Sequence, residues 1–401
     1  MAKYMAKSSE VEIYILVPKC SDEDKKAAKS YNINLVEASE KVGYAELYWL
    51  GRVPNKLLTH VVVGHDIELG RHALSIKESQ SPHCKYVQFI HKSYEEIGKY
   101  KENSNPKSTE ENHKLQVRLC RVSDFVVTIG PRLHEIVSSN LRPYKDGKRV
   151  FDFTPGILEE FTELEQSQEE LKHFRVVCFC GGGLEDFTLQ GVDIAAKAVA
   201  KLGDCNVLFI GAADGMQEEA RNRLLGYGID PKVLTIRSVF HIQESLKDVL
   251  LEVDLAIMPS REEGFGLICL KALSAGLPIL VSQNSGLGEA LMKIPSGSNF
   301  VVSSDDHGAW AKEIAKIRMK DRCTRLKEVK DLRHLFQEAH NWEKQIETLI
   351  CNLKSITNGM NFGDDKDGIY DNHKDHDDDD EEETEKLQNS AGKEIPQNGK
   401  N

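Results

Sequence analysis

The fold of this 401-residue chain is decided by residues 254–291, DLAIMPSREEGFGLICLKALSAGLPILVSQNSGLGEAL. The segment opens with an apolar run that is typical of a buried strand and that ends at Pro259–Ser260. An acidic loop then leads into the glycines of EGFG, and a helical pattern begins near Gly266. Glycines let backbone N–H groups approach an anion closely, and a helix N-terminus adds positive potential. The segment therefore predicts a site for a ligand that carries both a phosphate and a polyol.

The same alternation of short apolar runs and helical patterns surrounds this segment. In the second half of the chain we expect strands at Arg175–Phe179, Asn206–Ile210, Val233–Arg237, Leu255–Met258, Ile279–Val281 and Phe300–Val302. The helices between them are expected at Asp193–Leu202, Met216–Tyr227, Ile242–Glu252, Gly266–Ala275 and Gly288–Lys293. Such alternation predicts βαβ units and a parallel sheet.

The first half shows the pattern less regularly. Its strands are expected at Val11–Val17, Asn34–Val36, His60–Val63, Tyr86–Ile90 and Asp124–Ile129, with helices at Asp22–Tyr31, Gly70–Lys77 and Asn112–Val122. The polar stretch Ser93–Glu111 is interpreted as a loop or helix cap beside a strand end. Together the halves predict an α/β protein with two Rossmann-like parallel-sheet domains that face each other across a cleft.

Changes in composition divide the chain into five parts. We expect an N-terminal domain over residues 1–150, a hinge over 151–174, a C-terminal domain over 175–305, C-terminal helices over 306–357 and an acidic tail over 358–401. The hinge is placed by residues 142–157, where prolines and glycines interrupt the regular pattern as the chain passes between the domains. The last helical stretch is amphipathic, so we expect it to pack back across the first domain. The tail has too few apolar residues to order itself and is predicted to be disordered. Its His373, His376 and aspartates could bind cations loosely, but a solvated tail is the favoured interpretation.

Charge and hydropathy exclude several classes of protein. The net charge is −12, and residues 364–394 hold 14 acidic residues against 4 lysines, so the rest of the chain is nearly neutral and offers no broad basic surface for nucleic acid. There is no signal-peptide pattern and no run of eighteen apolar residues, so no transmembrane segment is expected. The nine cysteines form no CxxC pair, which is typical of reduced thiols, and we expect a soluble cytoplasmic protein. The GGGL sequence after a strand lacks a third glycine at the spacing of a dinucleotide fingerprint, so NAD is disfavoured.

The sequence PSREEGFGLICLKALSAGLPILVS resembles the signature of retaining GT-B glycosyltransferases of family 4. Further segments resemble the family in the same order: HVVVGHD and VQFIHK in the first half, DFTPGI at the hinge, and FCGGGLEDFTLQGVDIA and NVLFIGA in the second. The resemblance covers about Val11–Lys354. It implies a GT-B fold, a UDP-, GDP- or ADP-linked sugar as donor, an acceptor of unknown identity, and no metal cofactor.

The resemblance also implies roles for particular residues. On the donor side, Glu263 would hold the hexose, Arg237 would lie near the nucleotide base, and backbone amides would meet the sugar and distal phosphate at Gly264, Phe265, Gly266 and Leu267. From the first half, His91 would face the reacting sugar, which makes His91 and Glu263 the candidate catalytic pair, and His65 would lie on the acceptor side. The alternatives are a solvated loop for Glu263, satisfied structural histidines for His91 and His65, and a surface or salt-bridge role for Arg237.

Three departures from the family pattern bear on activity. Lys271 stands where the family has a second glutamate for the ribose hydroxyls, and lysine can only donate. The arginine and lysine that clamp the diphosphate are replaced within Gly181, Gly182 and Gly183 and by Gln190. Only Met1–Glu10 precede EVEIYILVP, where the family has a strand, a glycine-rich loop and a helix, so the first domain is expected to be incomplete. The sequence thus predicts a hexosyltransferase-like protein with weak or lost activity, or alternatively an inactive GT-B module for ligand sensing or protein interaction.

Overall fold

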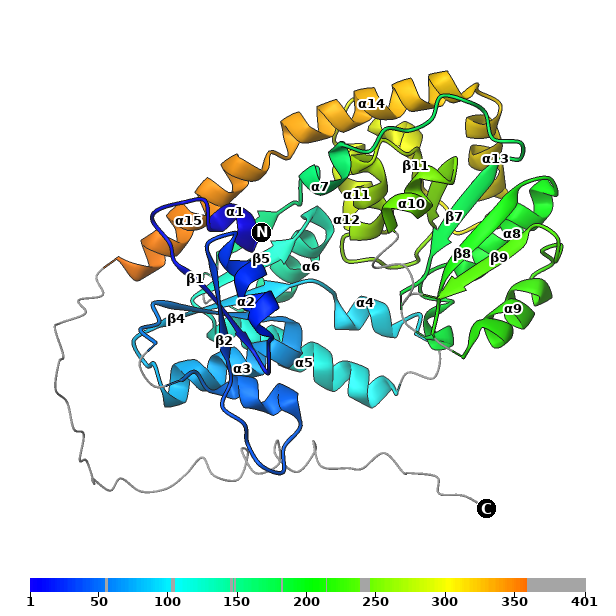
Figure 1. Ribbon diagram of the computed structural model, residues 1–401. Helices are drawn as coiled ribbons and strands as arrows, with labels where there is room; N and C mark the ends of the chain where they lie inside the picture. Colours follow the sequence, from blue (N-terminus) through cyan, green and yellow to red (C-terminus); the bar gives the residue numbers. More distant parts are fainter. Residues whose placement is uncertain are drawn as a thin grey trace, which may run out of the picture. The chain divides into compact units, whose positions relative to one another are not determined.

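A computed structural model describes residues 1–54, 57–101, 105–144, 147, 149–181, 183–213, 215–238 and 246–358. Residues Met1–Asn358 form one compact unit in which helices and strands alternate (Figure 1). Gly182 and the acidic tail lie outside the described residues. Among the helices that are described, none is long and apolar enough to cross a membrane.

The first half contains two parallel sheets. A two-stranded sheet pairs β1 with β2, and a four-stranded sheet has the order β3-β4-β5-β6. The strands are β1 (Ile13–Val17), β2 (Ile33–Glu37), β3 (Val61–His65), β4 (Lys85–Ile90), β5 (Phe125–Ile129) and β6 (Val150–Phe153). The helices are α1 (Ala2–Met5), α2 (Asp22–Lys29), α3 (Asp66–Ser79), α4 (Tyr94–Gly98), α5 (Pro106–Val122) and α6 (Pro131–Leu141), with a short 3-10 helix η1 (Glu46–Gly51).

Two expectations for this half need correction. The crossing expected at 142–157 contains strand β6, which pairs with β5 from Val126↔Val150 to Ile129↔Phe153 and completes the first sheet. The polar stretch after Ser93 is not a plain loop, because it holds α4 and the first turns of α5. Asn105 caps α5 through its side chain, and Pro106 occupies the first helical position, where the missing N–H costs nothing.

The second half is a six-stranded parallel sheet with the order β12-β11-β10-β7-β8-β9. Its strands are β7 (Arg175–Phe179), β8 (Asn206–Ala212), β9 (Leu234–Ser238), β10 (Leu255–Met258), β11 (Ile279–Ser282) and β12 (Val301–Val302). The helices are α7 (Glu159–Thr162), α8 (Val192–Leu202), α9 (Gln217–Gly226), α10 (Leu246–Leu251), α11 (Leu267–Ser274), α12 (Gly286–Met292), α13 (His307–Arg318), α14 (Arg322–Ala339) and α15 (Trp342–Thr357), with 3-10 helices η2 (Leu184–Asp186) and η3 (Gly297–Phe300). β10 and β11 are buried throughout, as expected of central parallel strands that helices cover on both faces.

Helix α15 returns to the first half, as its amphipathic pattern predicts. The indole of Trp342 stacks on Tyr4 at 4.8 Å between ring centroids and donates a hydrogen bond to the carbonyl of Ile157 at 2.9 Å. The side-chain amide of Gln345 pairs with both backbone groups of Thr154, at 2.9 and 2.6 Å. The C-terminal helix is therefore fastened to the segment that connects the halves.

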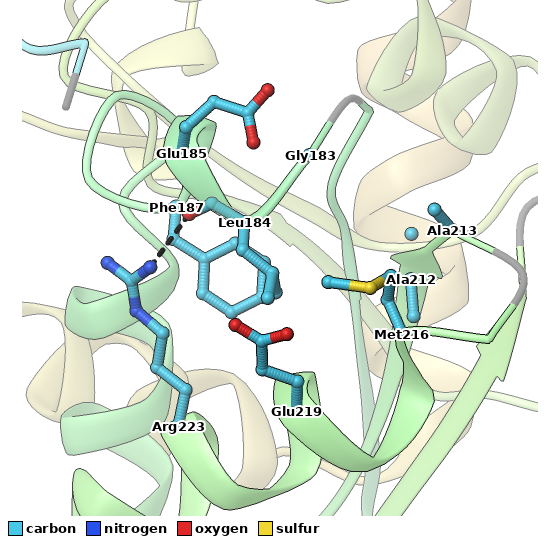
Figure 2. Close-up of a pocket in the computed structure, with 10 residues that line it drawn as sticks. Gly183, Leu184, Glu185, Phe187, Ala212, Ala213, Met216, Glu219 and Arg223 are labelled. Atoms are coloured by element: carbon cyan, nitrogen blue, oxygen red, sulfur yellow. Dashed lines mark hydrogen bonds between the residues drawn. The ribbon is translucent and has the colours of Figure 1, made fainter. Parts of the chain in front are cut away.

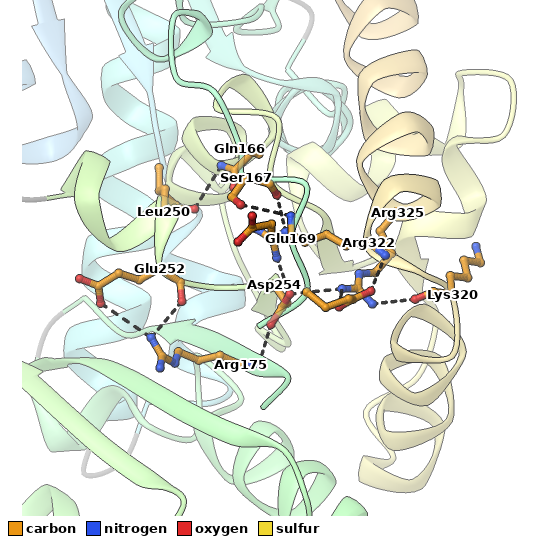
Figure 3. Close-up of polar contacts among 11 residues, drawn as sticks. Gln166, Ser167, Glu169, Arg175, Leu250, Glu252, Asp254, Lys320, Arg322 and Arg325 are labelled. Atoms are coloured by element: carbon orange, nitrogen blue, oxygen red, sulfur yellow. Dashed lines mark hydrogen bonds and ion pairs between the residues drawn. The ribbon is translucent and has the colours of Figure 1, made fainter. Parts of the chain in front are cut away.

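A buried ionic cluster anchors α14 to the second sheet (Figure 3). Asp254, which directly precedes β10, pairs with Arg322 and with Arg325, and all three side chains are at most 3% exposed. The other carboxylate oxygen of Asp254 accepts the backbone N–H of Arg175 at 2.9 Å. Glu170 meets Arg325 at 2.8 Å, so the connecting segment is held as well. This cluster lies at the amino-terminal edge of the sheet and stabilises the fold on the side opposite the strand ends that carry the candidate site.

Candidate functional site

The EGFG turn presents backbone amides that the protein does not use. Gly266 adopts φ +98°, which turns the chain sharply before α11. Within the described part of the chain, no hydrogen bond is donated by the amides of residues 264–268, while the carbonyl of Phe265 accepts from Leu287 at 2.8 Å. Five unpaired amides at the start of a helix form an arrangement that suits an anion. The amides expected to meet the donor, from Gly264 to Leu267, thus make no hydrogen bond to the described residues, although Phe265 and Gly266 are buried.

This turn is packed against the first half with no spare room. A β-carbon on Gly264 would lie 2.0 Å from the carbonyl oxygen of His91, which follows β4. The ring of Phe265 covers Gly130, where a β-carbon would lie 2.5 Å from Cδ2 of the phenyl ring. Phe265 is itself buried, so the turn joins the ends of β4 and β5 to the end of β10.

Glu263 stands half-buried at the start of the turn. Its backbone N–H donates to Asn284 at 3.1 Å, but its carboxylate has no hydrogen-bond partner among the described residues. Burial, and secondly the neighbouring Glu262, raise the pKa of Glu263 to about 7. A carboxyl group without a partner beside free amides is suited to accept hydrogen bonds from sugar hydroxyls.

A buried ion pair across the halves was not predicted from the sequence. Arg132, in the first turn of α6, donates from Nε to both carboxylate oxygens of Glu262, at 3.2 and 3.1 Å, and from Nη1 to Glu289 at 3.2 Å. The Glu262 side chain is 1% exposed and that of Arg132 is 18% exposed. Since Glu262 adjoins Glu263, this pair holds the backbone from which the Glu263 carboxylate projects. Its partners lie far apart in the chain, so no local pattern could have revealed it.

His65 and His91 form a pair at the ends of β3 and β4. His65 Nδ1 lies 2.7 Å from His91 Nε2, which requires that one nitrogen donate and the other accept. Burial and the proximity of His91 lower the pKa of His65 to about 4, and burial also lowers the pKa of His91. Asp66, at φ +48°, accepts the backbone N–H of His91 at 2.9 Å and fixes the strand end. The two predicted histidines are therefore brought together, and His91 adjoins Gly264.

The loop after β7 places Gly181 and Gln190 side by side. The side-chain amide of Gln190 donates to the carbonyl of Gly181, so this side chain is held by the backbone at the end of β7. The nearby Arg261 is held in a two-pronged pair with Asp193, at 2.7 and 2.9 Å, and so has its charge matched by a carboxylate. Gly182, the other predicted donor contact in this loop, lies outside the described residues.

Lys271 and Arg237 do not converge on this turn. The ammonium of Lys271 lies 5.9 Å from the ring centroid of Phe161 on α7. The guanidinium of Arg237 donates to Glu252 at 2.8 Å, as in the salt-bridge alternative. Glu252 precedes β10 and also lies 4.0 Å from Arg175, the first residue of β7, so it draws the Arg237 side chain away from the carboxyl ends of the strands.

A pocket of about 450 Å³ opens beside the β7 loop (Figure 2). It lies between η2 and α9, at the carboxyl ends of β7 and β8, and was not predicted from the sequence. Its lining consists of Gly183, Leu184, Glu185, Phe187, Gly211, Ala212, Ala213, Met216, Glu219 and Arg223. In the described portion of the chain, no group of three or more His, Cys, Asp or Glu side chains could hold a metal ion.

Solved structures share this architecture. The sucrose-phosphate synthase of Thermosynechococcus elongatus superposes with a TM-score of 0.67 over 88% of this chain and 91% of that one, at 14% identity. HepE of Anabaena, solved in complex with UDP and glucose, gives a TM-score of 0.66 over 88% and 94%, at 12% identity. These likenesses show a GT-B fold.

Curated relatives match part of the chain. The D-inositol 3-phosphate glycosyltransferase of Mycolicibacterium smegmatis is 32% identical over 189 residues, which are 46% of this chain and 41% of the relative. An uncharacterized glycosyltransferase of Methanocaldococcus jannaschii is 26% identical over 243 residues, 56% of this chain and 58% of the relative. The matched region thus spans less than two thirds of either relative. A family described as "Family 4 Glycosyltransferase in conflict systems" matches residues 1–349. The chain therefore belongs to the family 4 glycosyltransferases of conflict systems.

Proposed function

We propose that the protein transfers a hexose from a nucleoside diphosphate sugar to an acceptor, with retention of configuration and without a metal. The observation that carries the proposal is the row of unpaired amides at 264–268 beside the unpartnered carboxylate of Glu263. Across from them, the first half supplies the His65–His91 pair. Such a site offers donors for a phosphate and an acceptor for sugar hydroxyls within one turn of chain.

In this proposal the residues act mainly by positioning. The amides of residues 264–268 stabilise the charge that grows on the departing phosphate, and Glu263 accepts hydrogen bonds from the hexose. His91 faces the sugar from the opposite half, and the departing phosphate itself removes the proton from the acceptor hydroxyl. The acceptor then attacks from the same face of the sugar, which accounts for retention. Catalysis would then depend mainly on how precisely the reacting groups are positioned. The tight packing of Gly264 against His91 fixes the two sides of the site relative to each other.

Weak turnover is part of the proposal. The diphosphate would meet Gly181 and Gln190 in place of two cations, and each missing charge-assisted hydrogen bond is worth about 1.5–3 kcal/mol. Together they correspond to a loss of at least about a hundredfold in donor affinity or rate. The same observation favours the second candidate, an inactive module of the cytoplasm that senses a nucleotide sugar or binds a protein partner.

Donor hydrolysis and transfer assays with UDP-, GDP- and ADP-linked hexoses separate the two. Calorimetry with the same donors gives affinity independently of turnover. Turnover that falls at least about a hundredfold in Glu263→Gln supports the transferase. Binding without turnover supports the second candidate, the inactive sensing module. The absence of both binding and turnover with all donors overturns the proposal. Glu160→Gln, which alters an acidic residue at the start of α7, is a matched control that keeps the activity unchanged.

A further inference from the structure

The two residues expected near the nucleoside, Arg237 and Lys271, have other partners in the fold and do not form a nucleoside site together. Arg237 is paired with Glu252, and Lys271 lies beside Phe161, so neither is directed at a common cavity. A nucleoside nevertheless needs an apolar surface for its base and acceptors for its ribose hydroxyls. The pocket between η2 and α9 provides both.

The floor of this pocket is apolar and its walls are acidic. Leu184 and Met216 supply a surface on which a flat base can lie, and Figure 2 shows Glu219 extending from α9 toward Leu184 and the buried Phe187. The volume of about 450 Å³ falls within the range of about 300–1,000 Å³ that is typical of small-molecule sites. The pocket is therefore large enough for a nucleoside and has the mixed lining of such sites.

The charges of the pocket favour an uncharged polyol over a phosphate. Arg223 donates to the carbonyl of Leu184 at 2.8 Å and lies 5.0 Å from the ring centroid of Phe187, so it is engaged in the pocket wall. The lining also holds two carboxylates, those of Glu185 and Glu219, against this one cation. Carboxylates accept hydrogen bonds from hydroxyl groups but repel phosphates, so the ribose diol is the complementary group.

The distance from the EGFG turn also suits a nucleotide sugar. The sheet order places β10, β7 and β8 side by side, with the turn at the end of β10, Gly181 after β7 and the pocket at the end of β8. Parallel strands are about 4.8 Å apart, so the turn and the pocket are separated by roughly 10 Å. A hexose at the end of β10 and a ribose at the end of β8 would leave the diphosphate over β7.

We infer that this pocket holds the ribonucleoside of the donor, with Glu219 accepting hydrogen bonds from the ribose hydroxyls. The inference rests on the proposed function, because it assigns the other end of the same donor. It gives α9 the task that a glutamate at position 271 would otherwise perform. It also predicts that ribonucleotides are preferred over nucleotides that lack the ribose hydroxyls.

Calorimetry of the full chain with UDP, GDP and ADP, each beside its 2′,3′-dideoxy analogue, tests the inference. For the nucleotide that binds, Glu219→Gln is expected to weaken affinity about threefold to tenfold, the worth of one hydrogen bond, and to leave the dideoxy analogue unaffected. Glu218→Gln is the matched control, because it removes the same charge from the next residue of α9 outside the pocket. Equal effects of Glu218→Gln and Glu219→Gln on the ribonucleotide overturn the inference.

A second variant tests the cavity without changing charge. Met216→Trp fills the pocket and is expected to weaken binding of the ribonucleotide at least tenfold, with an unchanged unfolding midpoint. If both Met216→Trp and Glu219→Gln bind nucleotide like the wild type while Glu263→Gln abolishes transfer, the inference fails and the proposed function stands. If no nucleotide binds at any concentration, both fail together.

Discussion

The carbonyl oxygen of His91 lies against Gly264, 2.0 Å from the point where a β-carbon on that glycine would be. This contact joins the end of β4 in the first half to the turn that carries the unpaired amides. Any side chain at position 264 must therefore push the turn away from His91. The distance between His91 and the unpaired amides therefore depends on the absence of a β-carbon at position 264.

Gly264→Ala is expected to lower the free energy of unfolding by about 1–3 kcal/mol, the usual cost of overpacking. Donor turnover should fall with it, because the amides move relative to His91. Urea unfolding and the hydrolysis assay measure the two effects. Gly226→Ala is the control, since a β-carbon there meets nothing within 4 Å and alanine favours the helix. A Gly264→Ala variant as stable as Gly226→Ala would contradict the contact.

Arg132→Ala is expected to cost about 3–5 kcal/mol of unfolding free energy, because it leaves the buried carboxylate of Glu262 without a partner. The comparison is Arg237→Ala, whose pair with Glu252 is about two-fifths exposed and should be worth no more than about 1 kcal/mol. Urea unfolding midpoints of both variants, compared with that of the wild type, measure the two losses of stability. Similar losses in the two variants would show that the pair across the halves is not specially stabilising.

The raised pKa of Glu263 predicts a pH dependence of stability. The folded chain keeps this proton up to a pH of about 7, whereas the unfolded chain releases it near 4.5, so this group lowers stability as the pH rises between those values. Glu263→Gln removes the effect. The free energy of unfolding of the variant, minus that of the wild type, should therefore increase by on the order of 2 kcal/mol between pH 5 and pH 8. A difference between the two proteins that stays constant over this range, measured by urea unfolding, would exclude the raised pKa.

The pair formed by His65 and His91 predicts a fixed tautomer. His65→Phe removes the nitrogen that faces His91 Nε2, and ¹⁵N NMR of the His91 ring should then change from one tautomer to a mixture. Turnover should fall about threefold to tenfold, the worth of one hydrogen bond. His65→Gln, which can still hydrogen-bond, should retain more activity than His65→Phe. Unchanged ¹⁵N shifts in His65→Phe would show that the pair does not set the state of His91.

Restoring cations to the β7 loop should strengthen donor binding. A β-carbon on Gly181 would have Nε2 of Gln190 as its nearest neighbour, at 3.9 Å, so Gly181→Arg with Gln190→Lys fits without a clash. We expect calorimetry to show a gain of at least about tenfold in affinity for a nucleoside diphosphate sugar. Gly181→Met with Gln190→Met is the uncharged control. Adding Lys271→Glu should give no further gain if the ribose lies in the pocket of Glu219.

Regular elements with strong apolar runs could be predicted, and irregular ones could not. The bounds of β7 and β10 agree residue for residue with those expected, because central parallel strands are apolar on both faces. β6 escaped prediction because VFDF is only four residues long and follows a polar, proline-containing segment. Helix α5 was expected to begin at Asn112, although the cap at Asn105 and the following proline are visible in the sequence.

The site divides in the same way. The turn at Gly264 and the strand-end histidines could be found from motifs, because each motif is local. Arg132 could not, since Glu262 and Glu289 are 130 and 157 residues away and an arginine in a helix has no distinctive pattern. The position of Glu219 in a pocket could not be predicted either, because it depends on the fold, which places the end of β8 beside η2.

The chain passes between its halves twice, and the two passages touch. A β-carbon on Gly156, in the first passage, would lie 2.1 Å from the carbonyl oxygen of His340, in the second. Because the two connections touch, we expect the halves to move relative to each other mainly by rotation about the line through Gly156 and His340. A ligand that holds the halves together would then restrain few motions of the chain, which keeps the conformational entropy lost on binding small.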